Sequence, residues 1–167
     1  MPNAQLDVNR LYFLGYRVIR NAMKNPRLVK LIGSDSWNLH CDALIISKIE
    51  KIADRQKRIA RYLTTSSLER QALASLEEVY NTVNDSYVEV MTSYYNNDKM
   101  SSINIEVKNK ERTSLFDKFL EDYTKQYSLQ KNKNFVSNIV AVAKVVENLK
   151  ATSVEIRNIA RIVLCNE

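Results

Sequence analysis

The chain has 167 residues, of which 45% are hydrophobic and 26% charged, a balance typical of a globular protein and not of a disordered one. It contains only two Gly and two Pro, too few for the many turns of an all-β fold. No apolar run approaches the ~20 residues that cross a membrane, no signal peptide is recognisable, and two cysteines make no disulfide framework, so the sequence predicts a cytoplasmic, all-α protein.

The net charge of +6 is unevenly distributed along the chain. Residues 1–64 contain 12 Lys/Arg and 5 Asp/Glu, whereas residues 65–167 contain 13 and 14. Two interpretations stay open: a basic face that is simply solvated, or a face that binds an anionic partner such as nucleic acid, an acidic protein or a phosphate-bearing ligand.

The first predicted helix runs from about Leu6 to Lys24, with apolar residues at steps of three and four. Pro26 ends it, because the proline ring disfavours a helical conformation in the residue before it. We expect a short connector over Arg27–Gly33.

A second helix is predicted from Ser34 or Asp35, both good N-cap residues, to about Leu63. Its apolar seam alternates steps of four and three, the pattern of a long antiparallel bundle helix. The seam residues are Ile45, Ile49, Ile52, Gln56, Ile59 and Leu63.

The third predicted helix opens with the capping box Ser66–Glu69, in which each residue satisfies a backbone N–H near the other. Its seam continues through Val79, Val83 and Val90 at helical spacing. We expect the polar residues 96–98 to end it.

The remaining chain predicts two more long helices. Residues 103–107 alternate like a strand while residues 115–127 are plainly helical, so we expect one helix with an irregular start that ends at Gln130–Asn134. The last helix runs from about Phe135 to Leu164. Five long helices with short connectors predict an antiparallel bundle.

The second and last helices align without gaps at a separation of 100 residues, and five positions are identical. This agreement favours a duplicated helical unit, with two unrelated bundle helices as the alternative. The identical pairs are Asn38/Asn138, Ala43/Ala143, Ile59/Ile159, Ala60/Ala160 and Arg61/Arg161.

The stretch Ile49-Glu50-Lys51-Ile52-Ala53-Asp54, followed by Arg58-Ile59-Ala60-Arg61, resembles the repeat E-x-I-[GA]-D-x-x-x-x-I-A of the PhoU family of phosphate-uptake regulators. Residues 8–14 are similar to a helix that precedes this motif in archaeal members. By this resemblance, residues 65–167 form a three-helix PhoU-like unit. Residues 1–64 form an incomplete, basic unit of two helices, which lacks a leading helix.

The resemblance implies a PhoU-like helical bundle and a non-enzymatic regulator of phosphate uptake or phosphate signalling. Its implied partners are a phosphate transporter component or a sensor protein. The alternative is the sensing or dimerising part of a DNA-associated transcription regulator. We also expect a homodimer, because the absent helix would leave an apolar groove that a second chain fills.

Metal binding is a further expectation of the resemblance, since some PhoU proteins hold a metal ion through this motif. Glu50 and Asp54, at i and i+4, lie on one helix face and supply hard oxygen ligands for a divalent or ferric ion. Lys150 and Val154 stand at the equivalent positions of the last helix, where the acidic pair is lost. The alternative is that Glu50 and Asp54 pair with neighbouring cations on a solvated helix.

A basic stripe on the second helix is the candidate contact surface for an anion or partner, and it consists of Lys51, Arg55, Arg58 and Arg61. No aromatic interleaving or recognition-helix motif accompanies it, so nucleic-acid binding has no support beyond charge. The chain has a single histidine and no Gly-rich phosphate loop, and we therefore expect no enzymatic activity.

Overall fold

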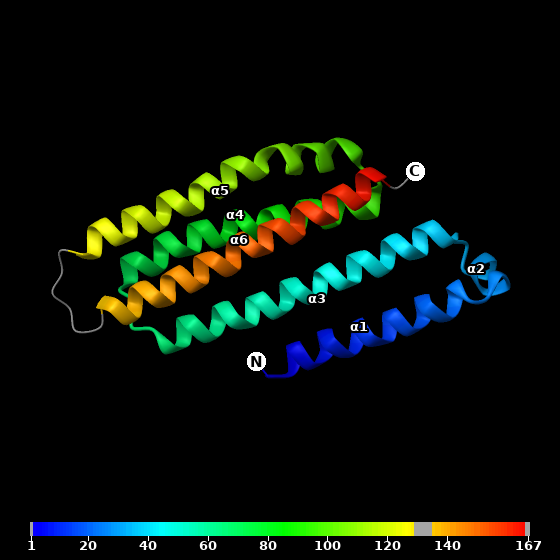
Figure 1. Ribbon diagram of the computed structural model, residues 1–167, viewed down its shortest axis with the longest axis horizontal. Helices are drawn as coiled ribbons and strands as arrows, with labels where there is room; N and C mark the ends of the chain where they lie inside the picture. The colour runs from blue at the N-terminus through cyan, green and yellow to red at the C-terminus, as the bar shows by residue number, and fades with distance from the viewer. Residues whose placement is uncertain (1, 129–134, 166–167) are drawn as a thin grey trace.

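A computed structural model describes residues 2–128 and 135–165, and all regular secondary structure in these residues is α-helical, as the sequence predicts. The helices are α1 (Pro2–Met23), α2 (Pro26–Leu31), α3 (Ser36–Thr65), α4 (Arg70–Asn96), α5 (Lys99–Ser128) and α6 (Phe135–Cys165) (Figure 1). The polar stretch Gln130–Asn134, predicted to end the fourth long helix, lies outside the described residues.

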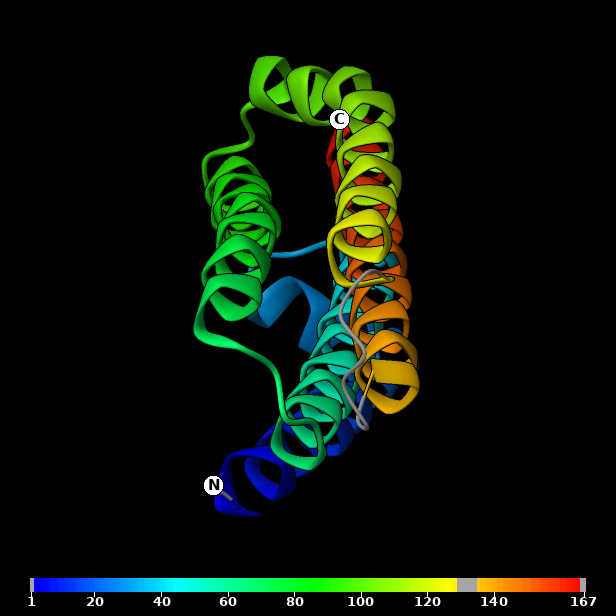
Figure 2. The same ribbon diagram turned by 90° about the vertical axis from the view of Figure 1, so that its left-hand side faces the viewer.

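Helix α6 lies at the centre of the arrangement and contacts α3, α4 and α5. Figure 1 shows α5, α6, α3 and α1 side by side in this order. Figure 2 shows α4 on one side of this curved layer, with α5 and α6 as its main neighbours. Helix α1 is the outermost member of the layer and packs against α3 and the short α2.

The hydrophobic core consists of two separate clusters. The main cluster joins α3, α4, α5 and α6, and Ile45, Phe116 and Leu149 are among its most buried side chains. A small cluster of Ile19, Ala22 and Leu39 attaches α1 to the start of α3. The main core therefore crosses the unit boundary expected near residue 64, while α1 is held by a smaller apolar patch.

The start of α3 follows the sequence prediction, but the connector before it is more ordered than expected. Asp35 caps α3, since its carboxylate accepts a hydrogen bond of 2.8 Å from the backbone N–H of Asn38. The segment expected to be a short connector, Arg27–Gly33, is mostly the helix α2, with Pro26 in its first turn and Asn25 as its N-cap. Asn25 and Pro26 are residue types typical of a helix start, whereas α2 is too short to show a periodic apolar pattern.

The predicted capping box at Ser66–Glu69 is wrong. The Ser66 hydroxyl instead donates a hydrogen bond of 3.0 Å to the carbonyl of Leu63 and so caps the end of α3. Helix α4 begins at Arg70, and Glu69 makes no side-chain capping hydrogen bond. The predicted end of α4 is confirmed, because Asn97 adopts a left-handed conformation with φ of 50°.

The irregular start expected for the next helix is also wrong, because α5 is helical from Lys99. The Asp98 carboxylate accepts hydrogen bonds from the Ser101 backbone N–H at 3.1 Å and the Ser101 hydroxyl at 2.6 Å, which stabilises this start. Ile105 is fully buried, while Ile103 and Val107 are exposed. The alternating pattern therefore reflects one core residue between two exposed apolar ones, not a strand.

Leu149, which is fully buried in α6, provides the test of this core. We expect Leu149→Ala to reduce the free energy of unfolding by about 3 kcal/mol, because it removes buried methyl groups and leaves a cavity. Val154→Ala, on the exposed face of the same helix, should change it by less than about 1 kcal/mol. Urea unfolding followed by circular dichroism measures both, and equal losses would contradict the central position of α6.

Candidate functional site

A buried carboxylate joins α3 to α6 in the middle of the molecule. Glu155 of α6 is only 6% exposed, and its side chain lies 3.2 Å from both Lys48 Nζ and Arg55 Nη2 of α3. Arg55 and Glu155 are separated by 100 residues, so they occupy equivalent positions in the alignment of the two helices. This ion cluster fixes the register of the α3–α6 contact.

The surroundings of Glu155 keep it ionised. Burial by itself raises the pKa of this carboxyl, but a hydrogen bond donated by Asn158 and the interaction with Lys48 outweigh it, so the pKa is lowered from its ordinary value of 4.5. Lys51 contributes further positive potential. A buried carboxylate with such partners stabilises the fold only while it is charged.

The predicted basic stripe divides into a structural part and an exposed part. Arg55 is half-buried against Glu155, whereas Lys51, Arg58 and Arg61 are exposed on α3. The Nε atom of Arg55 is buried and has no hydrogen-bond partner among the described residues. Lys51, Arg58 and Arg61 are therefore the members of the stripe that a partner can reach.

Sequence reasoning missed Lys48 and Glu155 as members of this cluster. A signal was present, because the repeat places an arginine and a glutamate of opposite charge at equivalent positions, 55 and 155. When two helices of similar length pack against each other in antiparallel directions, the positions that align at this separation meet near the middle of the contact. Predicting the Arg55–Glu155 pair from the sequence also requires that α3 and α6 be direct neighbours, which only the structure shows.

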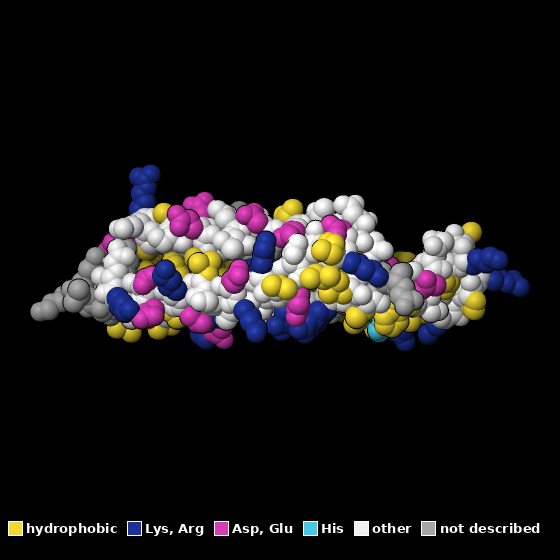
Figure 3. All heavy atoms as spheres, turned by 90° about the horizontal axis from the view of Figure 1, so that it is seen from above, with side chains coloured by type: hydrophobic (Ala, Val, Ile, Leu, Met, Phe, Trp, Pro, Cys, Tyr) yellow, Lys and Arg dark blue, Asp and Glu magenta, His cyan; other side chains and the backbone are white. Residues whose placement is uncertain are grey.

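The equivalent of Arg61 in α6 is also placed in an ion pair. Arg161 makes a forked interaction with the Glu106 carboxylate of α5, with Nη2 at 2.5 Å and Nε at 3.1 Å. Lys150 pairs with Asp117 of α5 at 2.5 Å. On the α5 side of the molecule, acidic and basic side chains are interspersed (Figure 3), so the excess positive charge belongs to α1, α2 and α3.

Glu50 and Asp54 lie half-buried on consecutive turns of α3. No group of three or more His, Cys, Asp or Glu side chains suited to a metal ion occurs within residues 2–128 and 135–165. Two carboxylates leave most positions of an oxygen-ligand shell to water, which makes a weak site for a divalent or ferric ion. The structure thus keeps the predicted pair together, and none of the described residues on neighbouring helices completes a group of three acidic ligands with it.

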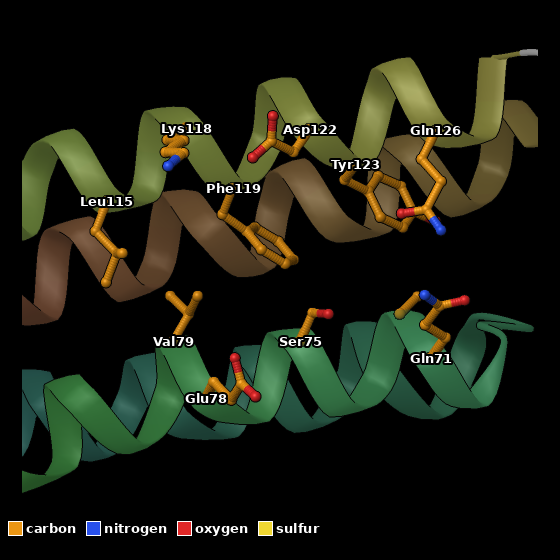
Figure 4. Close-up of a pocket in the computed structure, with 11 residues that line it drawn as sticks. Gln71, Ser75, Glu78, Val79, Leu115, Lys118, Phe119, Asp122, Tyr123 and Gln126 are labelled. Atoms are coloured by element: carbon orange, nitrogen blue, oxygen red, sulfur yellow. The ribbon is translucent and has the colours of Figure 1, made fainter.

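A pocket of about 260 Å³ opens between α4 and α5 (Figure 4). Val79, Phe119 and Tyr123 form its apolar walls, and Glu78, Lys118 and Asp122 lie around it. It contains none of the site residues predicted from the sequence, and no histidine or cysteine lines it. Its apolar walls favour weak apolar contact.

Comparisons of the chain with protein-family models, with curated proteins and with solved structures find no match. None of the helices in the described part of the chain combines the length and apolar character that crossing a bilayer requires.

The pH dependence of stability tests the role of Glu155. A lowered folded-state pKa stabilises the fold above the unfolded-state pKa, and this contribution is lost as the pH falls through the folded value. We expect Glu155→Gln to reduce the free energy of unfolding by about 3 kcal/mol at pH 7, since it leaves Lys48 and Arg55 without their counter-charge. The difference from wild type should shrink below pH 4.5.

Glu147→Gln is the matched control, because Glu147 pairs with Lys144 on the exposed side of the same helix. We expect this substitution to leave both the stability and its pH dependence nearly unchanged. A Glu155→Gln variant as stable as wild type at pH 7 would contradict the structural role of the ion cluster.

Thermal melting with added metals tests the carboxylate pair. With only Glu50 and Asp54 available, we expect millimolar Mg²⁺, Mn²⁺ or Fe³⁺ to leave the melting temperature unchanged, and elemental analysis to find much less than one metal ion per chain. The Glu50→Ala/Asp54→Ala variant serves as the control for nonspecific effects. A stabilisation present in wild type and absent from this variant would establish a metal site.

Proposed function

We propose that this chain is a PhoU-like, non-enzymatic regulator of phosphate uptake or phosphate signalling that acts through protein contacts. The observation that carries the proposal is the pair of related helices, α3 and α6, which share the motif register and pack against each other at the centre of the molecule. An arrangement of α4–α5–α6 as a three-helix unit, with α1 and α3 as two helices of a second, incomplete unit, is what this family resemblance implies.

The contact surface that we assign to this role is the exposed part of the basic stripe, Lys51, Arg58 and Arg61. Exposed cations at helical spacing attract an acidic partner and accelerate its association. A phosphate transporter component or a sensor protein is the kind of partner that the resemblance implies. A metal-dependent rise in melting temperature that is lost in Glu50→Ala/Asp54→Ala would link this contact to metal binding.

Genetic complementation tests the proposal. In the source organism, disruption of the gene should raise uptake of radiolabelled phosphate in phosphate-replete medium, because restraint of the transporter is lost. Wild-type protein should restore the restraint, and the variant Lys51→Glu/Arg58→Glu should not, because it reverses the charge of the contact surface. Unchanged uptake after disruption would refute the proposal.

Lys110→Glu is the control variant, since Lys110 is exposed on α5, away from the basic stripe. It should restore uptake control as well as wild type does, and circular dichroism should show all variants equally helical.

The alternative function, the sensing or dimerising part of a DNA-associated regulator, draws on the excess of Lys and Arg in residues 1–64. A mobility-shift titration at several salt concentrations discriminates it. Retention of duplex DNA near physiological salt, lost in Lys51→Glu/Arg58→Glu, would favour the alternative over a protein-contact regulator.

A further inference from the structure

Equivalent positions of α3 and α6 differ sharply in burial. In α6, Leu149, Ile156 and Ala160 are fully buried, with 0% exposure each. Their equivalents in α3, 100 residues earlier, are Ile49 and Gln56, which are only partly buried, and Ala60, which is exposed. The residue type is the same at 60 and 160, so the difference comes from what covers each helix.

Helix α4 provides the cover on α6. It packs against both α5 and α6, and its apolar seam joins the main core. A hydrogen bond that Tyr94 donates to Asp42 links α4 to α3 near the start of α3. Beyond that point, α3 and its neighbour α1 form a helix pair like α6 and α5. Among the described helices, none takes the place on this pair that α4 takes on α5 and α6.

Helix α1 carries an exposed apolar stripe beside its contact with α3. Leu11, Leu14 and Val18 are spaced by three and four residues on one face, and they are 67%, 59% and 53% exposed. An apolar stripe exposed to this extent marks an interaction surface. We call the combined surface the uncovered face, and it consists of Leu11, Leu14 and Val18 of α1 with Ala53, Gln56 and Ala60 of α3.

Charge decides which partner fits the uncovered face. Residues 8–34 contain six Lys/Arg and no Asp/Glu. A second copy that paired α1 with α1 would bring these cations together, and the apolar seam of its α4 is already buried in its own chain. Helix α4, which covers the equivalent face of α6, carries four acidic residues and one basic residue over Arg70–Asn96.

We propose that the uncovered face binds an acidic amphipathic helix of a partner protein, in the place equivalent to that of α4 on α5 and α6. This inference adds a second contact surface to the basic stripe of the proposed function, and it rests on that function for its biological meaning. Apolar residues of the bound helix pack on the uncovered face, and its acidic residues meet the cations of α1 and α2. Helix-in-groove binding of this kind requires no rearrangement of the main core.

Binding of a fluorescein-labelled peptide with the sequence of residues 68–97, measured by fluorescence anisotropy against the full chain, tests this proposal. The peptide is acidic and has the apolar seam that covers α6. We expect saturable binding that weakens as salt is raised. Leu14→Glu and Ala60→Glu should each weaken it at least about tenfold, because each places a carboxylate against an acidic helix.

The matched control is Val107→Glu, the same change at an apolar residue that is 66% exposed on α5. It should bind the peptide as wild type does. Absence of binding to wild type, or binding that ignores both Leu14→Glu and Ala60→Glu, would overturn the proposal. Binding that is unaffected by both substitutions would mean that the peptide displaces α4 from its place against α5 and α6.

Two further outcomes would assign the face to another occupant and also overturn the proposal. One is a dimer of the wild-type chain, seen by light scattering, that Leu14→Glu converts to a monomer. The other is co-sedimentation with phosphatidylglycerol-containing vesicles that Leu14→Glu abolishes. Failure of the peptide experiment would leave the phosphate-uptake result unaffected, so the two proposals fail separately.

Discussion

The contact between α3 and α6 is the interaction on which the rest of the structure depends. Helix α6 packs against α3 on one side and against α4 and α5 on the other, so nearly every turn of it is buried. Glu155 is placed within this contact and receives Lys48 and Arg55 from α3. A buried charge tolerates only an arrangement that supplies its partners, so the cluster specifies one register where apolar packing alone would accept several.

The two helices that align at a separation of 100 residues have unequal neighbours, and they differ in what they expose. Helix α6 lies under α4 and presents Leu149 and Ile156 to the core, whereas α3 has Ile49 and Gln56 at the same positions. The ion pairs follow the same division, since Arg161 is engaged by Glu106 of α5 while Arg61 is exposed. The side of the molecule formed by α1 and α3 therefore combines exposed apolar area with uncompensated positive charge, two properties of a surface that binds another molecule.

The candidate site was only partly predictable from sequence. Lys51 and Arg58 of the predicted basic stripe are exposed on α3, whereas Arg55 of the same stripe is half-buried against Glu155. Lys48 and Glu155 were missed because their pairing depends on two helices about 100 residues apart becoming neighbours. Glu50 and Asp54 remain together at i and i+4, but whether a third ligand approaches is decided by packing between helices, which periodicity within one helix does not describe.

The sequence by itself determined the helical class, the five long helices and most of their ends, because apolar periodicity, scarce Gly and Pro, and residues such as Asp35 and Asn97 act over a few residues. Two local predictions were wrong. Ser66 was predicted to cap α4, but its hydroxyl caps the end of α3, and residues 103–107 were predicted to start irregularly because exposed apolar side chains there alternate as in a strand. Only the tertiary structure decided which helix lies at the centre, which charges pair, and which face stays uncovered. These properties depend on contacts between residues far apart in sequence, and their energies arise from burial and desolvation that exist only once the helices are packed.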